Sequence, residues 1–522
     1  MQKIAQFFWR GPIPSGVLAF IAVCQFNLLI AWVCYIPIFI SIQGVKSFEA
    51  FKKGFCFGFI FSLLSFFWMI TGAERFTGYS MAYGLGVFLI SAVLYSLFCA
   101  ALLYSIVRVR NRETGFPSTI LYSLFVAAVF CIAEAIWRLV SSGLPWFDFH
   151  SGNPLTSNLY GIQPGTFFGI HIMTFIVVLV NCLLAMIIMR RTWKYLYIPV
   201  AIVAVYFVSG FLIFNSFEKV VPKSKAFSVA ILAENIPPGI KWDDNTGGML
   251  VKRLLDLNHV AASQKADLAL WSESAIPWTY SKEDDLVKEV FKITDPAKLA
   301  HIIGINTAYT QTQVFNSAYY ILPGGKVSGR YDKQHLLAFI EKPVSGMHIP
   351  FFSSSGFFAK IDTQKSKPLT TAFGNAGFLI CNEAALPGAA ASQVKQGAEF
   401  LFNLSNDGWF SDTYIVKAHF YYARLRAVES RKDIAINCNN GYSGLVKASG
   451  EISEQEISED PYVKRVTIQP NSMKTLATLS PNSFVYGCVG YAILFIMVNI
   501  TATQKRKHPS PSTIIAAGKS VI

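Results

Sequence analysis

Residues 376–383 read AGFLICNE, a short apolar run that ends at Cys381 and is followed by Asn382 and Glu383. A run of this length that stops at polar residues is typical of a buried strand. In α/β sheets, ligands bind outside the carboxyl ends of the strands. The segment therefore predicts a strand whose end places a cysteine where chemistry can occur.

Comparable short apolar runs lie on both sides of this segment, and helical stretches separate them. Strands alternating with helices in this way predict a layered α/β fold for residues 216–480. The expected strands are 227–233, 267–273, 300–306, 376–381, 400–405 and 434–438, and the expected helices are 246–264, 388–397 and 413–430.

The rest of the chain is far more apolar than this α/β segment. Of the 522 residues, 53% are hydrophobic and only 15% are charged, whereas a soluble domain carries about 25% charged residues. We therefore expect membrane helices in residues 1–215, and one more helix followed by a cytoplasmic tail in residues 481–522. A span needs roughly 20 apolar residues, and the clear candidates are 55–71, 86–107, 119–139, 167–189, 196–214 and 484–502.

The basic residues of the short loops predict the orientation. Loops 44–54, 108–118 and 190–195 carry three Lys or Arg residues each, whereas 72–85 and 140–166 together contain only Arg75. Loops rich in Lys and Arg prefer the cytoplasm. The apolar stretch 13–43 is long enough for one span or two short ones, and the charge pattern requires two. This gives eight spans, both termini inside, and residues 216–480 outside the cytoplasm.

The remaining composition excludes several classes of function. The net charge of +14 lies largely in these short loops, and no basic stripe with base-stacking aromatics indicates nucleic-acid binding. Seven of the nine cysteines lie in apolar runs, and neither CxxC nor a Cys/His ligand spacing occurs. We therefore expect no metal site and no cofactor. A disulfide between Cys381 and Cys438 remains open as an alternative role for these two cysteines.

Three residues of the α/β segment are candidates for catalysis. Cys381 needs a base or a positive neighbour to become a thiolate nucleophile. Glu273 closes the run LALWSE, and Lys333 lies in RYDKQH. Taken singly, a buried structural cysteine and two surface charges are the commoner interpretation. Spacing alone does not bring the three together.

Their order and surroundings resemble a known family. Glu273, Lys333 and Cys381 follow the order of the Glu-Lys-Cys centre of the nitrilase superfamily, and the whole chain is similar to one branch, the apolipoprotein N-acyltransferases. The matching segments are NIPPGIKWD at 235–243, WSESAIP at 271–277, YDKQHLLAFIEKPV at 331–344 and GFLICNE at 377–383, with Glu134, Arg138 and GLPW at 143–146 in the membrane half.

The resemblance implies a fold, a reaction and a location. The fold is a multi-span α-helical membrane domain of eight helices plus an α/β nitrilase-like αββα sandwich. The reaction moves an acyl chain from a phospholipid, phosphatidylethanolamine, through a thioester on Cys381 to the amine of diacylglyceryl-cysteine on an apolipoprotein. Glu273 is the base and Lys333 stabilises the oxyanion. A monomer in the bacterial inner membrane, with its catalytic domain facing the periplasm, is expected.

Other residues have supporting roles in this interpretation. Trp242 is expected to line the acyl path, and Glu341 and Glu383 to orient Lys333 or accept a proton. Asn382 departs from the family, which usually has tyrosine after the nucleophile. Glu134 and Arg138, four residues apart on a predicted span, are expected to pair.

The apolar loop 335–358 is expected to gate the site or dip into lipid. Three alternatives stay open for the protein: a membrane-tethered amidase, an inactive member of the family and a transporter-like membrane protein.

Overall fold

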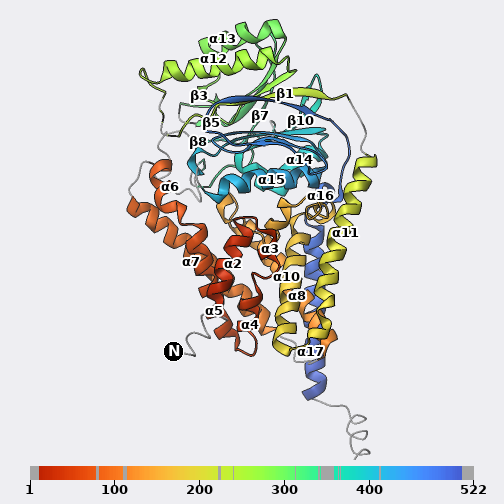
Figure 1. Cartoon of the computed structure of the whole chain (residues 1–522). Coiled ribbons are helices and arrows are strands. Elements are labelled where there is room, and N and C mark those ends of the chain that lie inside the picture. Colours follow the sequence, from red (N-terminus) through yellow and green to blue (C-terminus); the bar gives the residue numbers. More distant parts are fainter. Residues whose placement is uncertain are drawn as a thin grey trace, which may run out of the picture.

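The structure, a computed structural model, places an α/β domain on top of a bundle of long helices (Figure 1). It describes residues 11–77, 81–109, 115–220, 225–238, 240, 242–311, 313–338, 341–342, 358–362, 364, 366–410 and 413–507. The first ten residues and the last fifteen thus lie outside the described part.

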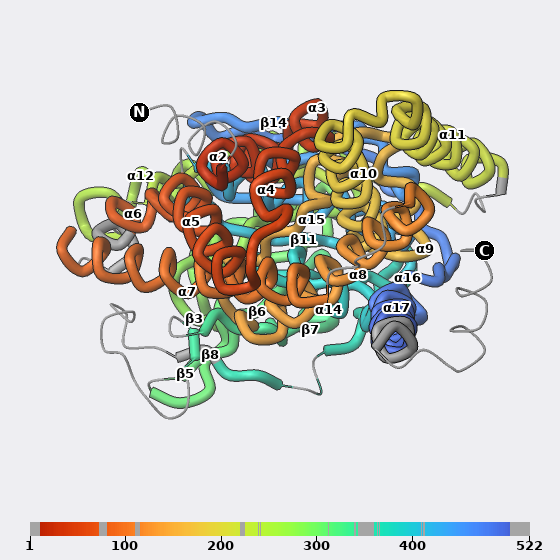
Figure 2. Tube along the Cα trace, turned by 90° about the horizontal axis from the view of Figure 1, so that it is seen from below, coloured from red at the N-terminus to blue at the C-terminus, as the bar shows by residue number. Residues whose placement is uncertain are grey.

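Five helices are long and apolar enough to cross a membrane, at 81–108, 116–140, 170–190, 193–219 and 483–501. They confirm five of the expected spans. Figure 2 shows α11 and α17 at one end of the bundle, and α6 and α7 at the other. The helices of this domain are α2 (Pro12–Val23), α3 (Leu28–Ala31), α4 (Ile36–Ser41), α5 (Ser47–Ser65), α6 (Trp68–Thr77), α7 (Met81–Arg108), α8 (Phe116–Val140), α9 (Gly165–Phe168), α10 (Ile170–Arg190), α11 (Tyr197–Val220) and α17 (Ser483–Lys507).

The stretch 13–43 forms three short helices, α2, α3 and α4, rather than one or two spans. Asn27 ends the first segment and caps α3 by accepting hydrogen bonds from the backbone of Leu29 and Ile30. The hydroxyl of Ser15, near the start of α2, accepts a hydrogen bond from the backbone of Ile38 in α4 at 2.9 Å. The chain thus folds back on itself, although neither arm reaches the length of a full span.

The boundary of the next helix was predicted wrongly. Residues 44–54 were expected to form a cytoplasmic loop and 55–71 a span, but α5 begins at Ser47 and ends at Ser65. Its first turns include Lys53, whose ammonium donates to the carbonyl of Ser41 at 2.6 Å. Lys53 therefore lies within a helix and not in a loop, with its charge bonded to the end of α4. Long helices account for only five of the eight expected spans among the described residues.

The α/β domain contains two sheets, and all six expected strands are present. In the first sheet the order β15-β1-β2-β4 continues through the antiparallel strands β6 and β7, and in the second it is β14-β13-β12-β11-β10-β9. The strands are β1 (Phe227–Ala233), β2 (Leu268–Leu270), β3 (Ile276–Thr279), β4 (Ala300–Ala308), β5 (Gln313–Phe315), β6 (Ser317–Leu322), β7 (Lys326–Asp332), β8 (Phe358–Ala359), β9 (Leu369–Thr371), β10 (Gly374–Ile380), β11 (Phe400–Asn406), β12 (Ile434–Asn439), β13 (Ser443–Val446), β14 (Ile452–Glu456) and β15 (Tyr462–Ile468).

The two sheets pack face to face over an aromatic core. Phe227 of the first sheet lies against Phe400 of the second, with ring centroids 4.9 Å apart. Helices α12 (Gly247–Ser263) and α13 (Asp285–Thr294) cover the outer face of the first sheet, and α14 (Pro387–Lys395) and α15 (Tyr414–Ser430) cover that of the second. This four-layer arrangement confirms the expected αββα sandwich.

Helix α15 also seats the sandwich on the membrane domain (Figure 1). The buried guanidinium of Arg424 donates to the backbone carbonyls of Thr156 and Ser157 at 2.9 and 2.7 Å. The hydroxyl of Tyr422 donates to the carbonyl of Asp148 at 2.8 Å. These bonds satisfy backbone groups of the 148–157 segment that would otherwise be buried without partners, so they fix the two domains relative to each other.

The side chain of Asn181 in α10 stabilises the folded-back start of the chain. Its carbonyl accepts from the backbone of Tyr35 at 2.9 Å, and its amide donates to the carbonyl of Ala31 at 2.8 Å. We predict that Asn181→Leu lowers the free energy of unfolding by about 1–3 kcal/mol, because both buried backbone groups lose their partner. Thermal unfolding in detergent micelles measures this.

The control for this variant is Ser105→Ala, which removes an exposed hydroxyl that bonds within α7. We expect its melting temperature to match that of the wild type. Equal melting temperatures for Asn181→Leu and the wild type would contradict the role given to Asn181.

Candidate active site

The structure brings Glu273, Lys333 and Cys381 together at the ends of three strands. Cys381 follows β10 and takes the left-handed conformation, with φ of 53°, which turns the chain sharply at the strand end. Lys333 follows β7, and Glu273 lies just beyond β2. The charge of the Glu273 carboxylate raises the pKa of the Cys381 thiol, so the two side chains are electrostatic neighbours. The sequence-based expectation that these residues share one site therefore agrees with the geometry.

The ammonium of Lys333 lies between two carboxylates. Its Nζ is 3.4 Å from Oε1 of Glu273 and 3.0 Å from Oε1 of Glu341. The side chain is almost wholly buried, so the charge depends on these partners instead of water. Glu341 is itself oriented by the backbone N–H of Leu337, which donates to Oε2 at 2.7 Å.

Asn316 is a member of the site that the sequence did not indicate. Its amide donates to Oε1 of Glu273 at 2.8 Å and to Oε1 of Glu341 at 3.3 Å. Its backbone carbonyl accepts from the backbone of Lys333 at 2.8 Å. Asn316 precedes β6 within QVFNSAYY, and no motif marks it there. It fixes both carboxylates around the lysine.

Burial and these neighbours set the protonation states at rest. Burial, followed by the charge of Glu273, raises the pKa of Cys381 well above its ordinary value, and Lys333 opposes this only in part. Burial also raises the pKa of Glu273, against the effect of Lys333. For Lys333, burial favours the neutral amine, but the charges of Glu341 and Glu273 outweigh it and raise the pKa. At neutral pH the site holds a thiol beside an ammonium.

The strand end that carries Glu273 is held by close packing. The backbone N–H of Ser272 donates to the buried Oε1 of Glu234 at 3.1 Å. Gly304 of β4 lies directly beneath, where a Cβ would be 2.0 Å from the carbonyl oxygen of Ser272. Only glycine allows the two backbones to come this close, so β4 fixes the position of the backbone at Ser272 and Glu273.

Glu383 connects the turn at Cys381 to the segment after Lys333 without touching the ammonium. Its carboxylate accepts from the backbone N–H groups of Ile380 at 2.8 Å, Gln334 at 2.7 Å and His335 at 3.0 Å. Tyr331 donates to it as well, at 3.0 Å. Burial raises the pKa of Glu383 to about 7 despite these donors. Of the two expected supporting carboxylates, Glu341 orients Lys333 and Glu383 joins two loops.

Asn382 lies beside this cluster, whereas Trp242 packs against the core between the first sheet and its helices. The amide of Asn382 donates to the carbonyl of His335 at 2.9 Å, which adds a second connection between the same two loops. Trp242 packs edge to face on Trp278 with ring centroids 5.2 Å apart, against the strand that follows Glu273. Most of the 335–358 loop, namely 339–340 and 343–357, lies outside the described residues, so the structure does not test its expected role.

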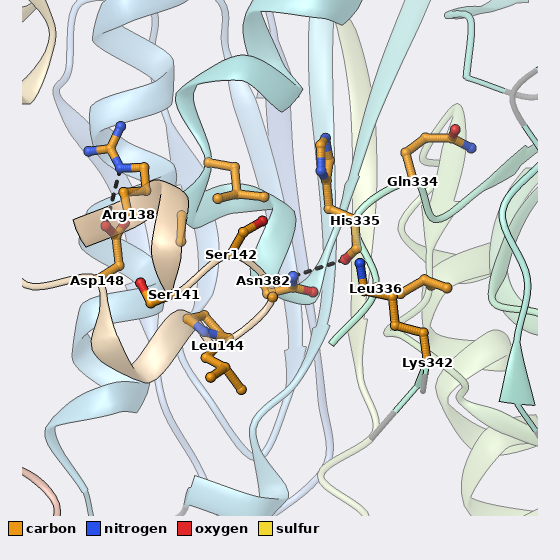
Figure 3. Close-up of a pocket in the computed structure, with 14 residues that line it drawn as sticks. Arg138, Ser141, Ser142, Leu144, Asp148, Gln334, His335, Leu336, Lys342 and Asn382 are labelled. Carbon is orange, nitrogen blue, oxygen red and sulfur yellow. Dashed lines mark hydrogen bonds and ion pairs between the residues drawn. The ribbon is translucent and has the colours of Figure 1, made fainter. Parts of the chain in front are cut away.

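A cavity next to Asn382 lies between the two domains (Figure 3). The membrane domain contributes Arg138, the 141–145 segment and Asp148, and the α/β domain contributes 334–336, Lys342, Asn382 and 385–386. The cavity has a volume of about 60 Å³, which suits one small polar group of a ligand and is below the usual volume of a pocket that encloses a whole ligand.

A polar network in the membrane domain corrects one expected pair. Arg138 pairs with Asp148 and not with Glu134: its Nε donates to Oδ1 of Asp148 at 3.2 Å. Oε2 of Glu134 instead lies 2.8 Å from Nδ1 of His150. Glu134, His150 and His171 place possible metal-ligand atoms within 4.8 Å of one another. The carboxylate of Glu134 already accepts from Ser151, Thr174 and His150, whereas Nδ1 of His171 has no hydrogen-bond partner among the described residues.

Both cysteines of the α/β domain are free thiols, so the structure contains no Cys381–Cys438 disulfide. Two sheets in an αββα sandwich, with a cysteine, a glutamate and a lysine converging at strand ends, define a carbon-nitrogen hydrolase domain. Accordingly, the family model for carbon-nitrogen hydrolases matches residues 228–476, and the model for the N-terminal domain of apolipoprotein N-acyltransferase matches residues 15–183.

The relatives match both domains at once. An apolipoprotein N-acyltransferase of Geobacter metallireducens is 26% identical and covers 81% of this chain and 82% of its own length. Those of Vibrio vulnificus and Chlorobaculum tepidum are 24% and 23% identical and cover 88% and 95% of this chain, and 90% and 96% of their own. A solved carbon-nitrogen hydrolase from Helicobacter pylori G27 aligns at 17% identity over 47% of this chain and 90% of its own, with a TM-score of 0.37. The chain belongs to the apolipoprotein N-acyltransferase family.

The effect of Glu273 on the thiol yields a test with a defined sign. We predict that Glu273→Gln lowers the pKa of Cys381, because it removes the negative charge that, after burial, raises it most. The pH at which iodoacetamide alkylates Cys381 half-maximally, followed by intact mass, should therefore fall below that of the wild type.

The matched control is Glu289→Gln, on the exposed face of α13, which should leave the alkylation profile unchanged. A midpoint for Glu273→Gln that stays in place or rises would show that the two side chains are not coupled.

Proposed function

We propose that this protein transfers an acyl chain from a membrane phospholipid to the amine of diacylglyceryl-cysteine on an apolipoprotein, through a thioester on Cys381. The observation that carries this proposal is the buried cluster in which the Cys381 thiol lies within the electrostatic influence of Glu273 and Lys333, while Lys333 lies between Glu273 and Glu341. The cluster belongs to a domain seated on apolar helices, and relatives of similar length carry the acyltransferase name.

The first half-reaction forms the acyl-enzyme. Glu273 takes the proton of the Cys381 thiol as the sulfur attacks the ester carbonyl of phosphatidylethanolamine or a similar phospholipid. The new C–S bond leaves an oxyanion, which the ammonium of Lys333 stabilises; one such donor is typically worth about 3–4 kcal/mol. The C–O bond then breaks, and the lysophospholipid leaves with the proton from Glu273.

The second half-reaction transfers the acyl chain to the acceptor. The neutral α-amine attacks the thioester carbonyl, and Glu273 accepts the proton that the new amide nitrogen loses. The C–S bond breaks, and the proton returns from Glu273 to the sulfur, so the thiol is restored. Because the donor product leaves before the acceptor reacts, the kinetics are ping-pong.

Incubation of the purified full-length protein with phosphatidylethanolamine tests the nucleophile. We predict that wild type gains one hydroxylamine-labile acyl group by intact mass, and that Cys381→Ser gains no such thioester. Cys438→Ser is the matched control, because it changes the other buried cysteine of the domain and should load like wild type. Thioester label on Cys381→Ser would contradict the assignment.

The fate of the acyl group separates transfer from hydrolysis. After a diacylated lipopeptide is added to the loaded enzyme, we expect the acyl chain on the lipopeptide amine, detected by mass spectrometry. Release of free fatty acid at the same rate with and without the lipopeptide would instead support a membrane-tethered amidase.

The proposed location places the catalytic domain in the periplasm of a bacterial inner membrane. Basic residues at the end of the bundle away from the α/β domain, such as Lys46 just before α5, support this orientation. We predict that an impermeant maleimide labels Ser281→Cys, on the exposed surface of the α/β domain, in intact spheroplasts. Lys46→Cys, also exposed, should react only after the membrane is permeabilised. The reverse pattern would invert the topology.

A further inference from the structure

We infer that the cavity between the domains (Figure 3) holds the phosphodiester of the donor phospholipid, with Lys342 and Arg138 as its cationic contacts. The inference rests on the proposed function and extends it, because it assigns a recognition site for the donor's headgroup. It concerns the phosphate that all common glycerophospholipids share, and not the amine or hydroxyl group beyond it.

The lining of the cavity has the charge that a phosphodiester needs. Its cationic side chains are Arg138 and Lys342, and its one carboxylate is Asp148. Burial, together with Lys342 and Lys333, lowers the pKa of His335, which keeps that imidazole neutral. The lining therefore carries one net positive charge, and a monoanionic phosphodiester would balance it.

Both cations have donors left for a ligand. Among the described residues, the half-buried ammonium of Lys342 has no carboxylate partner, because the adjacent Glu341 is engaged by Lys333. Arg138 uses Nε for Asp148 and one terminal nitrogen for His150, while Nη1 bonds to no group in the described part of the chain. Figure 3 places Arg138 and Asp148 on one side, Lys342 on the other, and Asn382 between them.

The cavity is placed to present the ester to the thiol. Asn382, in its lining, directly follows Cys381, while Gln334 and His335 directly follow Lys333. Only a few bonds separate the phosphate of a glycerophospholipid from its ester carbonyls. A phosphate in the cavity would thus hold the reacting carbonyl near the nucleophile and the oxyanion donor, which is the use of remote binding groups in catalysis.

Two exposed apolar side chains lie in sequence between Arg138 and Ser141, which both line the cavity. Leu139 and Val140, next to Arg138 at the end of α8, are 78% and 72% exposed. Exposed large aliphatic side chains at the end of a membrane helix are suited to contact with acyl chains. A phospholipid can therefore present its headgroup to the cavity from the level of the interface.

The acceptor lacks a phosphodiester, so the inference predicts that only donor loading depends on these cations. Full-length wild type, Lys342→Gln and Arg138→Gln are loaded with phosphatidylethanolamine, phosphatidylglycerol or the phosphate-free p-nitrophenyl ester of the same fatty acid. Thioester formation on Cys381 is followed by mass. We expect Lys342→Gln to load from either phospholipid roughly tenfold or more slowly, the usual effect of losing a charge-assisted hydrogen bond, and from the p-nitrophenyl ester at the wild-type rate.

Lys326→Gln, which removes an exposed cation of β7, controls for overall charge and should load like wild type from all donors. Arg138 also pairs with Asp148 within the membrane domain. If Arg138→Gln fails to fold, the result for Lys342→Gln alone decides the test. Equal loading of Lys342→Gln and wild type from phospholipid, or an equal loss with phospholipid and p-nitrophenyl ester, would overturn the inference alone. Absence of any thioester on the wild type would overturn the proposed function with it.

Discussion

The buried ammonium of Lys333 is the constraint around which the site is organised. A charge removed from water is stable only when its partners and hydrogen bonds are complete, and removing one partner of such a pair typically costs about 3–5 kcal/mol. Glu273 and Glu341 supply the opposite charges, and Asn316 holds both carboxylates. The same contacts hold the charge of Glu273 near the thiol of Cys381, whose pKa it raises, so the partners of the lysine also set the protonation state of the thiol.

A second buried carboxylate maintains the geometry of this cluster. Glu383 binds backbone groups of the nucleophile turn and of the segment after Lys333. The two loops come from different sheets, β7 in the first and β10 in the second. Glu383 therefore couples the two halves of the sandwich at the point where the thiol and the ammonium must stay aligned, and Asn382 strengthens the connection.

The contacts between the two domains place the candidate site beside the membrane domain. Arg424 and Tyr422 of α15 bond to the 148–157 segment of the membrane domain. The cavity beside Asn382 opens in the same junction. The α/β domain and its cluster of Glu273, Lys333 and Cys381 are thereby set against the apolar helices, which is the arrangement that the proposed transfer between lipids requires.

The sequence by itself determined the strands of the sandwich and five long apolar helices, because hydrophobic periodicity is a local property of the chain. The trio of Glu273, Lys333 and Cys381 was singled out by the order of motifs that resembles the family. It also carried the family resemblance. Only the tertiary structure decided which groups are partners: Asn316 enters the site, Arg138 pairs with Asp148 and not with Glu134, and Glu383 binds backbone instead of the ammonium. The tertiary structure also decided that 13–43 forms short helices, because Asn181 of α10 bonds to backbone groups of Tyr35 and Ala31 between them. Partners of buried polar groups are set by distances between segments far apart in sequence, and no local pattern records those distances.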